Sequence, residues 1–285
     1  MSDHQQHQND TGHEWDGIKE LNNPLPRWWL WTFYACIIFA IGYMVAYPSI
    51  PMLHTNSKGV LGYSSRAELE KSMAAAQAQR APIEKQLASL PIEQIASDPK
   101  LSRAAMEGGR SAFKVNCAQC HGSGAAGSKG FPNLNDDDWL WGGDINAIYT
   151  TINHGIRNQD DPAARQSAMP AFGRDGLLTR RQIWDVSEHV LKISGSPYDA
   201  KAEAKGAVIF GEQCAACHGP EGKGNRALGA PNLTDAIWLY GGDKAAIMAT
   251  ITNARNSQMP AWGKRLDDVT VRQLAVYVHA LGGGE

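Results

Sequence analysis

Two copies of the pattern Cys-x-x-Cys-His, at residues 117–121 and 214–218, constrain this chain more than any other feature of its sequence. Two thiols one helical turn apart can add to the two vinyl groups of a porphyrin, and the histidine that follows them is placed to bind the iron. The pattern therefore predicts two covalently bound c-type haems. The predicted attachment residues are Cys117, Cys120, Cys214 and Cys217, with His121 and His218 as iron ligands.

Other uses of a Cys-x-x-Cys pair fit this chain less well. A structural zinc site would require the two distant pairs to come together, and a thioredoxin-like redox pair would not require a histidine after each second cysteine. The pentads use four of the five cysteines. The fifth, Cys36, lies in an apolar run and is interpreted as a small packing residue.

An electron-transfer haem needs a sixth iron ligand, and methionine raises the reduction potential relative to a second histidine. Met169 is the single methionine between the two pentads, whereas Met248 and Met259 both follow the second. The sequence Ser-Ala-Met-Pro-Ala-Phe-Gly around Met169 matches Ser-Gln-Met-Pro-Ala-Trp-Gly around Met259, so Met248 is interpreted as a core residue. The predicted ligand pairs are His121 with Met169 and His218 with Met259.

The internal match extends well beyond the ligands. Two landmarks recur in the same order: Pro-Asn-Leu at 132–134 and 231–233, and Trp-Leu-(Trp/Tyr)-Gly-Gly-Asp at 139–144 and 238–243. Self-similarity of this kind indicates two copies of one fold. We place the two domains at residues 104–196 and 197–285.

Each copy is predicted to consist of short helices joined by Gly- and Pro-rich loops. Apolar periodicity predicts a middle helix at 146–152 and 244–251, and a closing helix at about 179–193 and 270–281. About 90 residues per domain is little for a core, so a buried porphyrin would supply much of the apolar volume. The predicted fold class is mostly α.

Residues 28–47 form an uncharged apolar run before the first domain. At 1.5 Å per residue, twenty helical residues span ~30 Å, the thickness of the hydrocarbon core of a bilayer. Aromatic residues and prolines at both ends favour one transmembrane helix over a buried core helix. A cleavable signal peptide fits poorly because a long polar, acidic stretch precedes the run. The remaining parts are a tail at 1–27 and a linker at 48–103 with a helical segment at 65–90.

Basic residues do not decide the orientation of this span. Lys19 and Arg27 precede it, and Lys58 and Arg66 follow it at similar distances. Because c-type haem is attached on the outer side of the bacterial plasma membrane, the haem domains are predicted to be periplasmic and the tail cytoplasmic. The expected location is the bacterial inner membrane, with a single pass.

The net charge of −2 gives no strong electrostatic field, so nucleic acid is not an expected partner. The acidic run 136–138 is either plain surface or a docking site for a basic carrier. Arg157 and Arg255 recur before each Met-Pro and are candidates for pairing with haem propionates. Trp139 and Trp238 recur as pocket-lining or core residues.

The two repeats resemble small monohaem cytochromes c in tandem. The resemblance covers residues 104–285 through the Cys-x-x-Cys-His, Pro-Asn-Leu and Met-Pro motifs in that order. It implies all-α haem domains, His/Met ligation and one-electron transfer. A haem with both axial positions filled offers no open iron site, so oxygen or peroxide chemistry is not expected there.

Residues 12–31, Gly-His-Glu-Trp-Asp-Gly-Ile-Lys-Glu-Leu-Asn-Asn-Pro-Leu-Pro-Arg-Trp-Trp-Leu-Trp, resemble the segment that leads into the membrane span of the dihaem subunit, CcoP or FixP type, of cbb3-type cytochrome c oxidases. With the span and the two haem domains behind it, the resemblance covers the whole chain. We expect this segment to contact partner subunits.

The resemblance implies a non-catalytic electron-transfer subunit of an oxidase that reduces oxygen to water and contributes to the proton gradient. Electrons would come from soluble cytochrome c or a quinol-oxidising complex and pass toward the haem-copper catalytic subunit. That subunit and a monohaem cytochrome c subunit are the implied membrane partners. The alternatives are an anchored dihaem carrier of another respiratory complex or periplasmic dehydrogenase, and a dihaem peroxidase-like enzyme.

Overall fold

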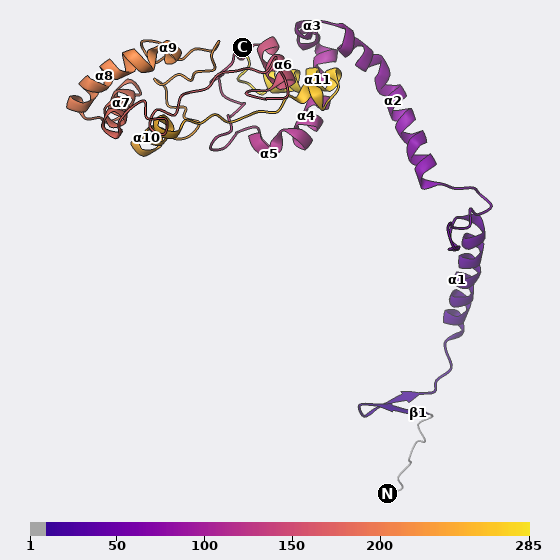
Figure 1. Cartoon of the computed structure of the whole chain (residues 1–285). Helices are drawn as coiled ribbons and strands as arrows, with labels where there is room; N and C mark the ends of the chain where they lie inside the picture. The colour runs from indigo at the N-terminus through magenta and orange to yellow at the C-terminus, as the bar shows by residue number, and fades with distance from the viewer. Residues whose placement is uncertain (1–9) are drawn as a thin grey trace. The chain divides into compact units, whose positions relative to one another are not determined.

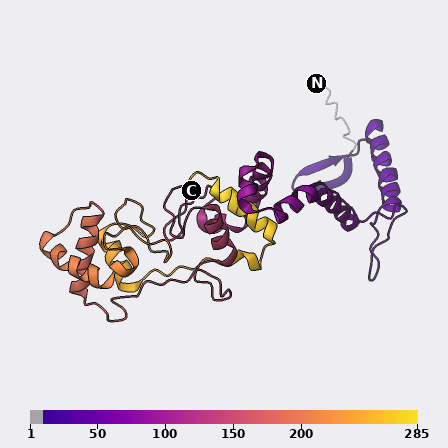
Figure 2. The same cartoon turned by 90° about the horizontal axis from the view of Figure 1, so that it is seen from above.

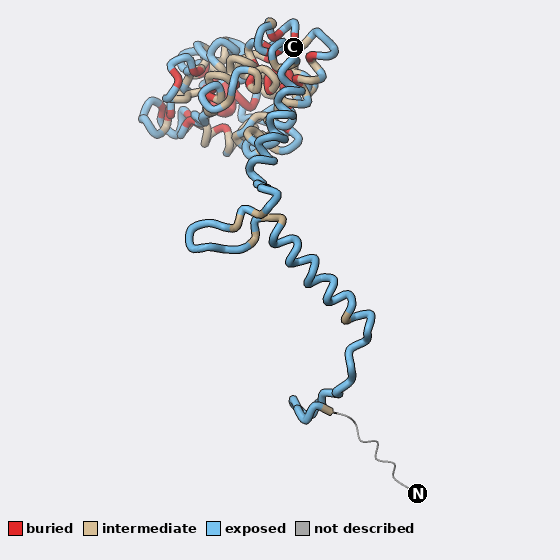
Figure 3. Tube along the Cα trace, turned by 90° about the vertical axis from the view of Figure 1, so that its right-hand side faces the viewer, coloured by how far each residue is buried: buried red, intermediate tan, exposed pale blue. Residues whose placement is uncertain are grey.

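The computed structural model describes residues 10–285, in two compact units that meet between Gln79 and Arg80 (Figure 1). Buried residues are concentrated in the second unit, whereas the helix of the first unit that could enter a membrane has none (Figure 3). Helix α2, Ser65–Ser89, crosses the boundary between the units and confirms the helical segment predicted at 65–90.

The first unit begins with a two-stranded antiparallel hairpin that the sequence analysis did not predict. Strand β1, Asp10–Trp15, pairs with β2, Ile18–Leu21. The turn between them is Asp16-Gly17, and both residues have positive φ angles, 49° and 84°. An Asp-Gly turn with two positive φ angles matches the right-handed twist of the strands, which explains why the chain reverses at this point.

Helix α1, Arg27–Ala46, confirms the predicted apolar helix. Among residues 10–285 it is the single helix with the length and composition to cross a membrane. Pro26 lies at its N-terminus, where the missing N–H of proline costs nothing. None of its residues is buried within the chain, and Cys36 is exposed on its surface. The apolar surface of α1 is therefore available to lipid or to other protein chains.

The second unit contains both repeats. The first repeat contributes α4 (Pro99–Asn116), α5 (Ala118–His121), α6 (Ile145–His154) and α7 (Arg180–Ile193), preceded by α3 (Ile92–Ser97). The second contributes α8 (Ala200–Gln213), α9 (Ala215–His218), α10 (Lys244–Asn253), a 3-10 turn η1 (Trp262–Lys264) and α11 (Asp268–His279). The predicted middle and closing helices are thus all present.

The second landmark of the repeat ends in the residue that starts the middle helix. Asp144 caps α6 by accepting bonds from the backbone N–H groups of Asn146 and Ala147, and Asp243 caps α10 through Ala246. An aspartate at this position satisfies amide groups that have no partner inside the helix. The recurring Gly-Gly-Asp therefore marks the N-terminus of the middle helix in each repeat.

The helices pack in a way that differs from sequential domains. The first core combines α3, α4 and α6 with α11, and includes Phe113, Ile148 and Leu274. The second core combines α8 and α10 with α7, and includes Val186 and Phe210. Each pentad-bearing helix is thus closed by the last helix of the other repeat, as Figures 1 and 2 show for α7 beside α8 and α11 beside α4. The domain boundary expected at 196–197 separates the repeats in sequence, not the two cores.

A glycine allows the close crossing of helices in each core. A Cβ atom on Gly109 of α4 would lie 2.1 Å from the carbonyl oxygen of Gln273 in α11. In the second core, a Cβ on Gly206 of α8 would lie 1.9 Å from the carbonyl oxygen of Asp185 in α7. The two crossings are equivalent positions of the repeat. Both cores therefore use the same helix packing, each with an exchanged partner.

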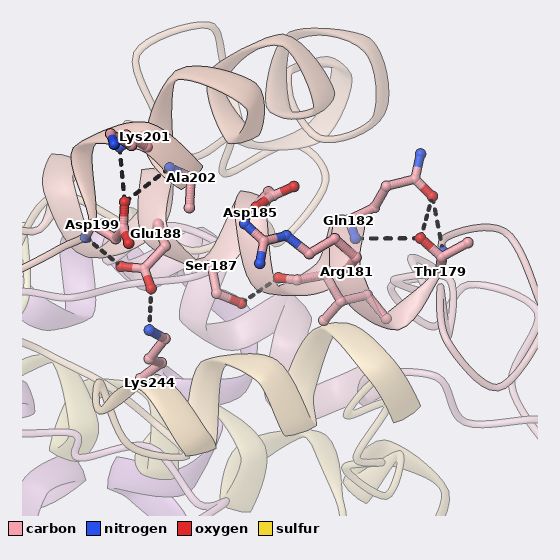
Figure 4. A network of polar contacts seen from close by, with 11 residues as sticks. Thr179, Arg181, Gln182, Asp185, Ser187, Glu188, Asp199, Lys201, Ala202 and Lys244 are labelled. Atoms are coloured by element: carbon pink, nitrogen blue, oxygen red, sulfur yellow. Dashed lines mark hydrogen bonds and ion pairs between the residues drawn. The ribbon is translucent and has the colours of Figure 1, made fainter.

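A buried polar network holds α7 in the second core (Figure 4). Glu188 is 1% exposed, forms an ion pair with Lys244 of α10 and accepts a bond of 2.9 Å from the backbone N–H of Asp199 at the start of α8. The Lys244 ammonium also lies 3.2 Å from the ring centroid of Trp184. Asp185 pairs with Arg181 at 3.0 Å. Glu188 therefore joins all three helices of the second core.

We expect Glu188→Gln to destabilise the second unit by about 3 kcal/mol, because removing one partner of a buried ion pair leaves the other charge without compensation. The measurement is denaturant unfolding followed by helical circular dichroism. Glu212→Gln, at an exposed position of α8, is the control and should change stability little. Equal unfolding midpoints for the two variants would contradict this role of Glu188.

Candidate haem-binding site

Each pentad folds as a single helical turn that continues a long helix. Cys117 is both the C-cap of α4 and the N-cap of α5, and Cys214 has the same place between α8 and α9. The backbone N–H of each second cysteine donates to the carbonyl of the first cysteine at 3.1 Å. A tight turn of this kind holds the two thiols of each pair at the spacing that thioether attachment to one porphyrin requires.

The Pro-Asn-Leu landmark orients the histidine of each pentad. His121 Nδ1 lies 3.1 Å from the carbonyl oxygen of Pro132, and His218 Nδ1 lies 3.1 Å from that of Pro231. A carbonyl only accepts, so Nδ1 carries the proton and Nε2 is left with a free lone pair. Burial also lowers the pKa of both imidazoles, which favours the neutral form. Both histidines are therefore prepared to bind a metal through Nε2.

The first cysteine of each pentad is in an environment that suppresses thiolate formation. Burial, with a smaller contribution from the neighbouring cysteine, raises the pKa of the Cys117 and Cys214 thiols to about 11. A redox-active cysteine needs a stabilised thiolate, which these surroundings do not provide. All four pentad cysteines are also free of disulfide bonds. The environment disfavours a redox-active pair.

One continuous cavity of about 780 Å³ contains both pentads and both predicted methionine ligands. Its lining is mainly apolar and includes Phe172, Val190 and Leu233. Volume and lining are of the kind that holds a large, flat, apolar cofactor. The donor sets of the two pentads meet this cavity from opposite repeats, so the residues present fit two haems.

The structure groups the methionines with the pentads differently from the predicted pairs. Met259 packs against the first core, together with Cys117. Met169 packs against the second core, together with Cys214. The physical reason is that each methionine loop precedes a closing helix, and the closing helices are exchanged. Met259 thus shares a core with the first pentad's Cys117, and Met169 shares a core with the second pentad's Cys214.

The other residues singled out from the sequence lie either in a core or on the cavity wall. Met248 packs against the second core, which confirms that interpretation. Trp238 lines the cavity, whereas Trp139 packs against the first core and donates through Nε1 to the carbonyl of Gly283. The arginine side chains predicted near the propionates, Arg157 and Arg255, both line the cavity.

Sequence reasoning missed two aromatic residues that line the cavity. A Cβ on Gly229 would lie 2.2 Å from the ring of Trp141, and a Cβ on Gly130 would lie 3.2 Å from the ring of Tyr240. Trp141 and Tyr240 occupy equivalent positions of the repeat, as do the two glycines. Each aromatic ring therefore lies against the pocket loop of the other repeat. The sequence signal that could have identified them is their shared position in the repeated Trp-Leu-(Trp/Tyr)-Gly-Gly-Asp landmark.

The acidic run 136–138 is only partly at the surface. Asp138 is partly buried, and burial, with the nearby charges of Asp235 and Asp136, raises its pKa from the ordinary value of 3.8 to about 6. Nearby Arg226 opposes this rise. Asp138 thus belongs to the junction between the two repeats, and within the run Asp137 is the exposed residue.

Comparison with known proteins decides the family. Residues 7–54 match the N-terminal domain of cytochrome oxidase-cbb3, FixP, and residues 104–190 and 201–278 match cytochrome c oxidase, cbb3-type, subunit III. The chain is 55% identical to the cbb3-type cytochrome c oxidase subunit CcoP of Cereibacter sphaeroides, over 96% of this chain and 95% of the relative. This chain belongs to the CcoP/FixP family of cbb3-type cytochrome c oxidase subunits.

Further relatives agree with this CcoP/FixP assignment. The FixP subunit of Sinorhizobium medicae is 54% identical, over 96% of this chain and 94% of the relative, and that of Azorhizobium caulinodans is 55% identical, over 96% and 93%. The assignment confirms the predicted family, the two cytochrome c domains and the role in electron transfer to the catalytic subunit of the oxidase. It also makes the chain a membrane protein, in agreement with α1.

We expect Asp138→Asn to stabilise the second unit at about pH 7 but not at about pH 4. The raised pKa means that the folded state favours protonated Asp138. The stabilisation of the fold by this preference is present below pH 3.8 and is lost as the pH rises through about 6. Asparagine does not ionise, so the variant avoids this loss of stability at neutral pH. The measurement is the unfolding midpoint at both pH values, with Asp137→Asn as the control; a gain of the same size at both would contradict the assignment.

Proposed function

We propose that each pentad binds one c-type haem and that the two repeats exchange their methionine ligands. Cys117 and Cys120 would attach the first haem, with His121 and Met259 on its iron. The second haem would be attached through Cys214 and Cys217, with His218 and Met169 as ligands. The packing of each methionine against the core of the other repeat's pentad carries this proposal. When bound, the two haems supply one-electron redox centres.

The protein residues would keep these centres closed to external ligands. A histidine and a methionine would hold each iron, which would leave neither iron a free site for oxygen or peroxide. The mainly apolar lining of the cavity and the methionine ligand would both favour the reduced state of each haem. Because one cavity is lined by both pentads, the two haems would lie close to each other, and electrons could pass between them within this chain. This supports an electron carrier rather than a peroxidase.

The proposed orientation places the haem domains in the periplasm and the N-terminal tail in the cytoplasm of a bacterium. Attachment of c-type haem outside the plasma membrane supports it. Electrons would enter from a soluble cytochrome c or a quinol-oxidising complex. They would leave toward the haem-copper catalytic subunit, with a monohaem cytochrome c subunit as a further membrane partner.

The hairpin and α1 are the proposed contacts with these membrane partners. An isolated two-stranded hairpin is marginally stable in water. Here Trp15 is 66% exposed and Ile18 is 73% exposed, directly opposite each other in the register. Exposed apolar side chains at such a pair, followed by a helix without buried residues, are typical of a segment that is completed by other chains.

The exchanged ligation is tested in proteins that retain one haem. In Cys214→Ala/Cys217→Ala, which keeps only the first haem, Met259→His should lower the reduction potential and abolish the long-wavelength methionine-to-iron absorption, because histidine replaces methionine on that iron. Met169→His should change neither. In Cys117→Ala/Cys120→Ala the effects should be reversed. Loss of the absorption on Met169→His in the protein with only the first haem would establish sequential ligation instead.

The contact with the oxidase is tested by affinity purification from detergent extracts. We expect Trp15→Ser/Ile18→Ser to reduce the amount of haem-copper catalytic subunit that co-purifies with the tagged chain by about tenfold, since buried aromatic anchors carry much of an interface's binding energy. Leu69→Ser, at an exposed position of α2, is the control. Equal recovery of the catalytic subunit with both variants would show that the hairpin is not part of the interface.

A further inference from the structure

We propose that Arg157 and Asn256 form a cross-tie between the two methionine loops, residues 167–170 and 257–260, and that this cross-tie couples the iron ligation of the two haems. Arg157 would be a positioning residue for both methionines at once. This inference rests on the proposed function in requiring that Met169 and Met259 are iron ligands.

The Arg157 side chain bonds to both methionine loops. Its Nε donates to the carbonyl oxygen of Ser257 at 2.7 Å, and its Nη1 donates to that of Ser167 at 2.9 Å. Each serine stands two residues before a methionine, Met259 and Met169 respectively. A planar guanidinium offers several donors in a fixed geometry, so one side chain can hold two carbonyls in a defined relation. Arg157 thus bridges loops that lie about ninety residues apart in sequence.

Asn256 makes the connection in the opposite direction. It belongs to the segment that leads to Met259, yet its side-chain Oδ1 accepts from the backbone N–H of Met169 at 3.2 Å and its Nδ2 donates to the Met169 carbonyl at 3.3 Å. The backbone N–H and C=O of Met169 are therefore both hydrogen-bonded to the residue that directly precedes the second methionine loop.

A short antiparallel bridge attaches Arg157 to the second of these loops. The backbone N–H of Ile156 donates to the Met259 carbonyl, and the Met259 N–H donates to the Ile156 carbonyl, both at 3.0 Å. Arg157 directly follows Ile156. A displacement of Met259 would therefore move the backbone that carries Arg157, and with it the bond to Ser167.

The backbone of Arg157 is itself unusual. Its φ is 50°, a conformation that residues other than glycine adopt uncommonly. Such a conformation persists where the surrounding structure holds it and is often found at functional sites. Here the half-buried guanidinium compensates its lost hydration through the two carbonyls. The positive φ angle of Arg157 and its two bonds to carbonyl oxygens together indicate a specific structural role for this side chain.

The test uses the full dihaem chain in the oxidised state and titrates it with imidazole, which competes with methionine for the iron. In Arg157→Met, the imidazole affinity should rise about tenfold at both haems, because each methionine loop loses a hydrogen bond from a charged donor. The absorbance amplitude of the tighter phase should then correspond to both haems. Arg174→Met removes an exposed arginine whose side chain pairs with Asp175, and should leave the affinity unchanged.

Asn256→Ala provides an independent variant. It should raise the imidazole affinity severalfold at one haem, the one that Met169 ligates, because two neutral bonds to the Met169 backbone are lost. If Arg157→Met does not retain two haems, this variant decides: a response at half of the total amplitude supports the cross-tie, and no response overturns it.

Two kinds of failure are distinguishable. A wild-type chain without two haems, or without the methionine-to-iron absorption, would contradict the proposed function. With both present, a response to Arg157→Met at one haem only, or at neither, would overturn the cross-tie alone.

Discussion

The structure of the haem-bearing unit depends on the crossing between each pentad-bearing helix and the closing helix of the other repeat. Gly109 and Gly206 permit the two helix pairs, α4 with α11 and α8 with α7, to approach until a Cβ atom would overlap a backbone carbonyl. Close packing of this kind gives most of its stabilisation through burial of apolar side chains. Because the partner helix comes from the other repeat, neither core can form completely from one half of the chain.

The exchange has a direct consequence for the proposed haem sites. The chain must cross from one core to the other after α6 and again after α10, and both crossings carry a methionine. These segments meet at the Ile156–Met259 bridge and share the bonds of Arg157 and Asn256. Two cavities that would be separate in independent domains therefore become one. Electron transfer between the haems and the mechanical linkage of their ligands would both follow from this single topological feature.

The sequence was sufficient wherever the signal is local. The uncharged run predicted helix α1, and the apolar periodicity predicted all the middle and closing helices. It was not sufficient to predict which core each of Met169 and Met259 packs against, because the two repeats present the same pattern to both cores. The Trp141 and Tyr240 contacts were missed for the same reason, since each depends on a glycine of the other repeat.

One difference between the repeats explains why α7 closes the second core. Glu188 of α7 is equivalent to Val276 of α11, and Lys244 at the start of α10 is equivalent to Ile145 at the start of α6. The second core thus holds an ion pair where the first core holds two buried apolar residues. If α7 closed the first core, the Glu188 carboxylate would be buried near Ile145 without a counter-charge, which costs several kcal/mol. If α11 closed the second, Lys244 would face Val276. The ion pair adds little stability over an apolar pair of similar size, but it penalises the wrong partner, and so it makes the exchange specific.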